Sequence, residues 1–277
     1  MAADEPAVSD EGPPAGHAVA LRFGVLDGMP LDHAVTGRGG GVSSGAYASL
    51  NLGLTVGDDP ALVAENRRRA AAAVGCRLDE MVFAHQVHGA TVAVVTGADR
   101  GRGAQALHGA PSADALVTAV PDVGLAVVVA DCLPLVLYDP VAHVVAVVHA
   151  GWRGTVARVA EATVDAMAGL GSRPGDVVAG LGPAVAAHRY QVGGEVVDAA
   201  AACFDGRPGD VVRPDGTGRW TFDLTAANRR LLVEAGVAPA NIEASPVGTG
   251  PGTAFFSDRA TRPCGRFGAL ARLHPRR

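Results

Sequence analysis

Two valine-rich segments of this chain end in residues that can bind a metal ion, Cys132 and His149. Turn-forming residues separate the segments, so the pair is expected to form a β-hairpin whose first strand spans residues 124–134. With Pro140 and Val141 at the tip, Cys132 lies directly opposite His149. Opposed side chains share one face, with Cβ atoms roughly 4.5–5.5 Å apart. That spacing suits two ligands of one zinc ion.

Pro134 lies within the first of these strands. Proline cannot donate a ladder hydrogen bond, so a β-bulge or an edge position is expected there. The register matters, because a slip of one residue would put Cys132 and His149 on opposite faces of the hairpin.

A third ligand is expected from one of two histidines that are three residues apart, His85 and His88. A helix would put both on one face, and a strand would put them on opposite faces. Gly89 indicates a turn, and the β-rich residues 90–95 indicate a strand after it. We therefore expect only one of the two histidines to point at the metal. Together with the hairpin, this segment favours a metal site over a pair of ordinary core residues.

Three motifs carry a resemblance to a known family: QVHG from residue 86, ADCLP from residue 130 and HAGWRG from residue 149. They resemble the laccase-domain family, also called YfiH-type or multicopper-polyphenol-oxidase-like, whose later description is as purine nucleoside phosphorylases. Further matching segments extend from about residue 20 to the C-terminus. The resemblance implies layered sheets flanked by helices. It also implies a metal held by His88, Cys132 and His149, which leaves His85 outside the ligand set.

The activity that this resemblance implies is zinc-dependent phosphorolysis of purine nucleosides. Adenosine, inosine or 5′-methylthioadenosine would react with phosphate, and adenosine deamination would be a further activity. A role in editing peptidoglycan precursors is the alternative. The candidate residues for binding phosphate or nucleoside lie in the matching motifs and are Arg38, Ser43, Asn51, Arg153, Ser257, Arg259 and Arg266.

Three ligands of nitrogen, sulfur and nitrogen type leave one coordination position open, as in catalytic zinc sites. Copper would also bind such a set. A multicopper oxidase needs several copper centres, and this composition disfavours it, because the other histidines show no paired ligand spacing: His17, His33, His108, His143, His188 and His274. The usual nucleobase-deaminase signature, H-x-E with a later P-C-x-x-C, is absent.

The sequence allows two roles for each of two residues near the proposed ligands, Asp131 and Arg153. Asp131 could act as a general acid or base, but on a regular strand its side chain points away from the metal, which favours a structural role. Arg153 begins an expected helix, whose N-terminus favours anions. A phosphate site beside the metal and a solvated arginine are equal alternatives for it. The glycine-rich loop 38–45 could present N–H groups to an anion, although a tight turn is the commoner explanation.

The composition excludes several classes of protein. A net charge of −5 argues against a general nucleic-acid binder, which needs a basic face. Four scattered cysteines do not form a disulfide framework. Neither a signal peptide nor an apolar run of roughly 20 residues is visible, so a cytoplasmic protein with no membrane partner is expected. Its expected partners are a purine nucleoside and phosphate.

The elements expected from the sequence form one α+β domain, with mixed sheets and helices on the outer faces, over residues 18–277. Residues 1–17 are acidic and rich in proline and glycine, which predicts a disordered tail. Helices are expected at 58–75, 152–171, 193–203 and 224–236, and further strands near 18–26, 176–181 and 241–247.

Overall fold

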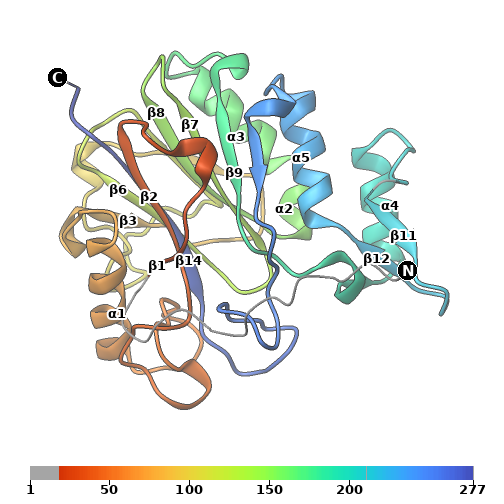
Figure 1. The fold of residues 1–277 in the computed structure, drawn as a ribbon, viewed down its shortest axis with the longest axis horizontal. Helices are drawn as coiled ribbons and strands as arrows, with labels where there is room; N and C mark the ends of the chain where they lie inside the picture. Colours follow the sequence, from red (N-terminus) through yellow and green to blue (C-terminus); the bar gives the residue numbers. More distant parts are fainter. Residues whose placement is uncertain (1–18, 210, 277) are drawn as a thin grey trace, which may run out of the picture.

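The computed structural model describes residues 19–209 and 211–276, so the predicted tail at residues 1–17 lies outside the described residues. Two large sheets pack face to face, and helices cover their outer faces (Figure 1). The five-stranded sheet runs in the order β1 (Val19–Leu21), β2 (Leu31–Thr36), β14 (Phe267–Leu273), β6 (Gly124–Val129) and β3 (Met81–Phe83). The six-stranded sheet runs in the order β13 (Ile242–Ala244), β9 (Val178–Leu181), β7 (Leu133–Asp139), β8 (Val144–Ala150), β5 (Ala115–Thr118) and β4 (Val92–Val94).

The helices form the two outer layers. They are α1 (Pro60–Ala72), α2 (Trp152–Val156), α3 (Val159–Ala168), α4 (Gly194–Cys203) and α5 (Leu224–Glu234). Helix α1 packs on the five-stranded sheet, and α3 and α5 pack on the six-stranded sheet (Figure 1). A third, small sheet contains β10 (Gln191–Val192), β12 (Trp220–Phe222) and β11 (Val212–Pro214) beside α4. This arrangement confirms the expected single α+β domain of layered mixed sheets.

The connections contain short 3₁₀ helices, which are η1 (Gly24–Leu26), η2 (Gly45–Tyr47), η3 (Leu78–Glu80), η4 (Gly97–Asp99), η5 (Pro174–Asp176), η6 (Ala187–Arg189) and η7 (Pro239–Asn241). Among the described residues, no helix is long and apolar enough to cross a membrane.

The central strands are apolar on both faces because each face is covered. In β7, Leu135 points toward the helices, whereas Val136 and Tyr138 point toward the other sheet. The side-chain period of two therefore divides one strand between two cores. Helix α1 begins as its sequence predicts, since the Asp59 side chain accepts a hydrogen bond from the N–H of Ala61 at 2.8 Å.

Some local expectations are wrong. The expected strand 124–134 is broken at residues 130–132, so β6 and β7 belong to different sheets. The expected helix 152–171 is divided into α2 and α3, because Arg158 adopts a left-handed backbone conformation with φ of 63°.

Pro134 is neither in a bulge nor on an edge. It is the second residue of the central strand β7 and pairs with His149. The pairing of β7 with β9 begins only at Leu135, so the missing N–H of proline removes no ladder bond.

Candidate functional site

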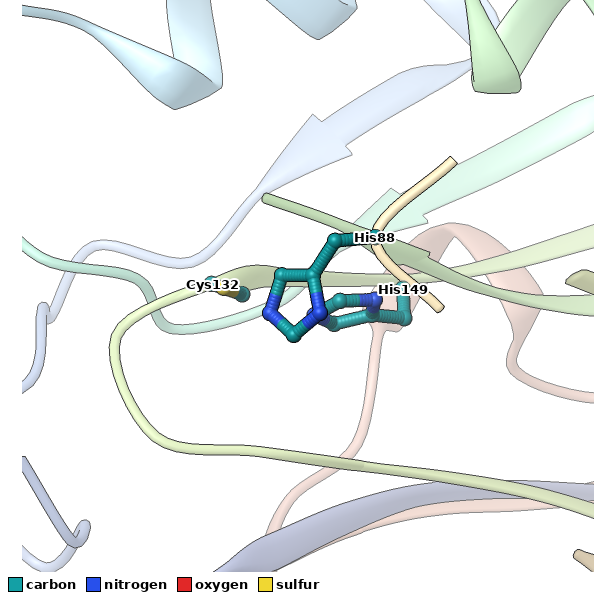
Figure 2. A group of neighbouring side chains, drawn as sticks. All are labelled: His88, Cys132 and His149. Atoms are coloured by element: carbon teal, nitrogen blue, oxygen red, sulfur yellow. The ribbon is translucent and has the colours of Figure 1, made fainter. Parts of the chain in front are cut away.

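Three side chains from separate parts of the chain meet at the open end of the β7–β8 hairpin: His88, Cys132 and His149 (Figure 2). Their ligand atoms all lie within 4.8 Å of one another. The two imidazole rings are nearly perpendicular, with centroids 4.7 Å apart. His149 is buried, Cys132 is half-buried and His88 is exposed, so the group is reached from the His88 side.

The hairpin register differs from the predicted one. Asp139 pairs with Val144 around a four-residue turn, and His149 pairs with Pro134 instead of Cys132. Each residue thus meets a partner two positions from the expected one. Because side chains alternate with a period of two, an even displacement leaves the faces of the hairpin unchanged. Cys132 lies one residue before β7 and packs, like Val136 and Val147, against the core between the two sheets, the face to which alternation also assigns His149. Their convergence therefore survives the error in register.

His88 reaches the site from the loop that follows β3. Its backbone has φ of 59°, a left-handed conformation that is uncommon outside glycine. The Gln86 side chain anchors the loop to β6, since its amide donates to the Val128 carbonyl at 2.7 Å and accepts from the Val128 N–H at 2.9 Å. His85 lines the same cavity but lies outside the group of three.

Asp114 orients the two histidines and is completely buried. Its Oδ1 accepts hydrogen bonds from Nδ1 of His149 at 2.8 Å and from the N–H of His88 at 2.9 Å. Its Oδ2 accepts from the N–H of Gly89 at 2.7 Å. The proton on Nδ1 leaves Nε2 of His149 free to act as a ligand, an arrangement common in zinc sites.

The charges of the group favour a deprotonated thiol. Burial by itself would raise the pKa of Cys132, but His149 and His88 together outweigh it and lower the pKa of the thiol. Burial opposes a charged His149 in turn, yet Cys132 and Asp114 raise the pKa of His149 above its usual value. Without a metal, Nε2 therefore also carries a proton, which a bound ion would displace. Thiolate is the form of cysteine that binds metals.

Open space lies between the three ligands. A Cβ atom placed on Gly151 would come within 3.0 Å of Cys132 Sγ, 3.3 Å of His88 Cδ2 and 3.9 Å of His149 Cε1. Glycine at this position keeps the centre of the group free. The donor types, the free Nε2 and this gap fit a tetrahedral metal ion with one open position.

The group lies in a cavity of about 490 Å³ at the carboxyl ends of the parallel strands β3 and β6. Two aromatic side chains, Trp152 and Tyr190, line it. The arginines that line it are Arg67, Arg153, Arg259, Arg262 and Arg266. Its only lining carboxylates among the described residues are Asp131 and Asp258, so the cavity favours an anionic ligand.

Of the residues predicted to bind substrate, Arg153, Arg259 and Arg266 line this cavity. Arg153 stacks on Trp152, with its guanidinium carbon 4.2 Å from the ring centroid. Arg259 lies over Tyr190 at 5.7 Å. Helix α2, which carries Arg153, has only five residues, so its dipole adds little to an anion site.

The other predicted residues lie outside the cavity lining. Arg38 is over the Phe256 ring, with its guanidinium carbon 5.2 Å from the centroid. Ser43 hydrogen-bonds to Asp58 at 2.6 Å, and Asn51 accepts from the N–H of Arg266 at 2.8 Å.

Four N–H groups of the glycine-rich loop 38–45 donate to other parts of the protein. Those of Arg38 and Ser43 donate to the carbonyls of Ala254 at 2.7 Å and Ser49 at 2.9 Å. Gly41 donates to Ser49 Oγ at 3.0 Å, and Val42 donates to Asn66 at 2.8 Å. The tight-turn explanation holds for these N–H groups, which are not available to an anion.

Asp131 departs from the strand geometry on which its prediction rested. It precedes β7 in a left-handed conformation with φ of 79°. Its carboxylate accepts hydrogen bonds from the hydroxyls of Thr249 and Ser257 and from the N–H of Arg259 at 2.6 Å. Asp131 therefore joins the loop that carries Arg259 to the segment that carries Cys132.

Sequence reasoning missed Asp114, Arg67 and Tyr190. Nothing in the sequence near Asp114 distinguishes it from other aspartates. Arg67 did carry a signal, because it shares the buried stripe of α1 with Val63 and Ala70 at helical spacing, whereas its neighbour Arg68 is exposed.

The sequence matches the family model described as multi-copper polyphenol oxidoreductase laccase over residues 32–274. A purine nucleoside phosphorylase of Deinococcus radiodurans is 44% identical over 217 residues, which are 76% of this chain and 77% of that protein. A protein named adenosine deaminase RL5, from an unknown prokaryotic organism, is 40% identical over 229 residues, 81% of this chain and 86% of that one.

Solved structures share the fold. YlmD from Geobacillus stearothermophilus superposes with a TM-score of 0.86 and 36% identity, covering 91% of this chain and 94% of that one. The Bacillus licheniformis protein YfiH superposes with a TM-score of 0.84 and 33% identity, covering 90% and 98%.

Proposed function

Because the chain belongs to the multi-copper polyphenol oxidoreductase laccase family, whose relatives include named purine nucleoside phosphorylases, we propose that it is a zinc-dependent purine nucleoside phosphorylase. It would convert adenosine, inosine or 5′-methylthioadenosine and phosphate to the free base and a ribose 1-phosphate. The observation that carries this proposal is the His88–Cys132–His149 group, which opens into an arginine-lined cavity.

One metal ion accounts for these three ligands, and zinc is the ion that we propose. In the part of the chain that the structure describes, this is the one cluster of three or more histidine, cysteine or acidic residues with metal-ligand geometry. A multicopper oxidase requires more than one such centre. A bound zinc ion would act as a Lewis acid toward an oxygen or nitrogen atom of the substrate at its open position.

The remaining steps belong to the protein's own residues. Arg153 and Arg259 would hold the phosphate nucleophile, since guanidinium groups bind phosphate oxygens in pairs. Trp152 and Tyr190 would pack against the purine. Asp131 would position Arg259 by accepting a hydrogen bond from the backbone N–H of Arg259. Asp114 would keep the proton on Nδ1 of His149 and so orient its ring.

Release of free base by the zinc-loaded protein tests this proposal. Adenosine, inosine and 5′-methylthioadenosine are each incubated with and without phosphate, and base and ammonia are measured separately. We expect base release that depends on phosphate. Its absence with saturating phosphate and a full complement of zinc would reject phosphorolysis.

Adenosine deamination is the second candidate, and one observation favours it: a relative that matches over 81% of this chain is named an adenosine deaminase. The same open metal position can activate water for attack on a purine ring. Ammonia released from adenosine without phosphate, and without free adenine, would support this activity.

Replacing Gly151 with alanine is expected to weaken metal binding by about tenfold or more, because the added methyl group occupies the space between the three ligands. Gly151 has φ of −76°, which alanine adopts without strain, so the melting temperature should hardly change. Competition with a chromogenic chelator measures the affinity. Gly175→Ala is the matched control, since a Cβ atom there meets nothing within 4 Å; equal affinities in the two variants would contradict the expectation.

A further inference from the structure

Arg67 is a buried arginine that the proposed reaction does not use. It extends from α1 and is 2% exposed. Its Nε donates to the Leu52 carbonyl at 2.8 Å, and its Nη1 donates to the carbonyls of Gly103 at 2.6 Å and Ala104 at 3.2 Å. One face of the guanidinium covers the Phe83 ring, 4.1 Å from the centroid. These contacts fix the position of the group and carry no negative charge.

The charge of Arg67 lacks a counter-ion. Within residues 19–209 and 211–276, no carboxylate forms an ion pair with it. Burial lowers the pKa of Arg67 to about 9, and no neighbouring charge offsets this effect. A buried charge is costly unless it is paired, so an unpaired arginine at this depth points to a ligand that supplies the charge.

One nitrogen of Arg67 remains available to such a ligand. Nη2 donates to none of the described residues, and it is not among the polar atoms sealed from solvent without a partner. Arg67 lines the same cavity as the metal-ligand group, beside the wall formed by residues 53–55. The available donor therefore keeps solvent access in a side chain that lines this cavity.

The carboxylates of the cavity are paired with other groups, so none of them neutralises Arg67. Arg262 and Arg266 are both paired with Asp258. Asp131 already accepts three hydrogen bonds. No carboxylate of the cavity is thus directed at Arg67 in the described structure.

We propose that Arg67 forms an oxyanion subsite of the cavity that binds a phosphate group, distinct from the exposed arginines Arg153 and Arg259. This inference rests on the proposed function, in which phosphate groups occur in two forms. One is free inorganic phosphate, and the other is a phosphoryl group carried by a sugar or nucleoside. Both present the same oxygen atoms to a guanidinium.

Three variants separate the charge of Arg67 from its structural contacts. Arg67→Gln removes the charge and keeps an N–H donor for the surrounding carbonyls. Thr55→Glu leaves Arg67 and its hydrogen bonds intact and adds a carboxylate to the cavity wall at an exposed position. Arg68→Gln is the matched control, because Arg68 lies on the same helix, is exposed and pairs with Glu65.

Calorimetric titration of the zinc-loaded full chain with inorganic phosphate, adenosine and adenosine 5′-monophosphate tests the subsite. If free phosphate binds there, its Kd rises about tenfold or more in Arg67→Gln and Thr55→Glu and is unchanged in Arg68→Gln. If a substrate phosphoryl group binds there, the wild type prefers the monophosphate over adenosine, and both variants lose this preference. If circular dichroism shows that Arg67→Gln does not fold, the phosphate affinity of Thr55→Glu tests the subsite.

The subsite is overturned if phosphate and monophosphate bind the folded variants as tightly as the wild type. Base release by the wild type is scored separately. If the wild type releases base in a phosphate-dependent reaction and the variants bind phosphate and monophosphate as tightly as the wild type, only the subsite is rejected. If the wild type releases no base but the variants bind phosphate or monophosphate more weakly, the proposed function is rejected and the subsite is supported.

Discussion

Replacing His149 with alanine is expected to abolish both metal binding and base release. His149 supplies the most deeply buried of the three ligands, and its Nδ1 is already held by Asp114. Without its Nε2, only His88 and Cys132 remain, and two ligands hold zinc far less tightly than three. We expect kcat for phosphate-dependent base release to fall by on the order of 10³-fold or more, the loss that follows removal of a principal electrostatic stabiliser.

Metal analysis of the purified protein and the rate of base release measure this effect together. Cys132→Ala should behave in the same way, because it removes the sulfur ligand. His85→Ala is the control for metal content, since His85 lines the same cavity and lies outside the ligand group. Full metal content and wild-type turnover in His149→Ala would show that the reaction does not depend on this group.

Asp114→Asn is expected to weaken metal binding by roughly 10–100-fold although no ligand is removed. The carboxylate accepts from Nδ1 of His149 and from the N–H groups of His88 and Gly89. An asparagine side chain has one acceptor oxygen, so in either orientation its NH₂ group faces a donor. At least one donor loses its partner, which should also cost about 1–3 kcal/mol of folding free energy.

A chelator-competition titration gives the metal affinity of Asp114→Asn, and urea unfolding gives its stability. The matched control is Asp215→Asn, because Asp215 also accepts backbone N–H groups, from Thr217 and Arg219, but lies outside the cavity lining. Wild-type metal affinity in Asp114→Asn would mean that the ring of His149 is oriented without the carboxylate.

The convergence of Cys132 and His149 was predictable from the sequence, and the reason is parity. Residue type marks them as candidate ligands, and any even shift of the hairpin leaves the faces of β7 and β8 in the same relation. Cys132, one residue before β7, stays on this face and packs against the core between the two sheets. The prediction thus tolerated a register that was wrong by two positions. The same local logic placed α1, whose start depends on the capping side chain of Asp59.

Only the tertiary structure decided which groups surround these ligands. The expected strand 124–134 is divided between β6 and β7, which belong to different sheets, and only the packing of the two sheets decides this. Asp114 meets His149 because β5 pairs with β8, and that pairing joins residues 35 positions apart. Arg67 enters the cavity because α1 packs on the five-stranded sheet.

The physical difference is the range of the interaction. Strand alternation and helix capping act over a few residues, so the residue pattern by itself determined the Cys132–His149 pair, the class of fold and the position of α1. The choice of His88 over His85 rested on the family resemblance. The partner of a buried charge or imidazole is set by which surfaces pack together. For Asp114 and Arg67, that information exists only once both sheets and α1 are assembled.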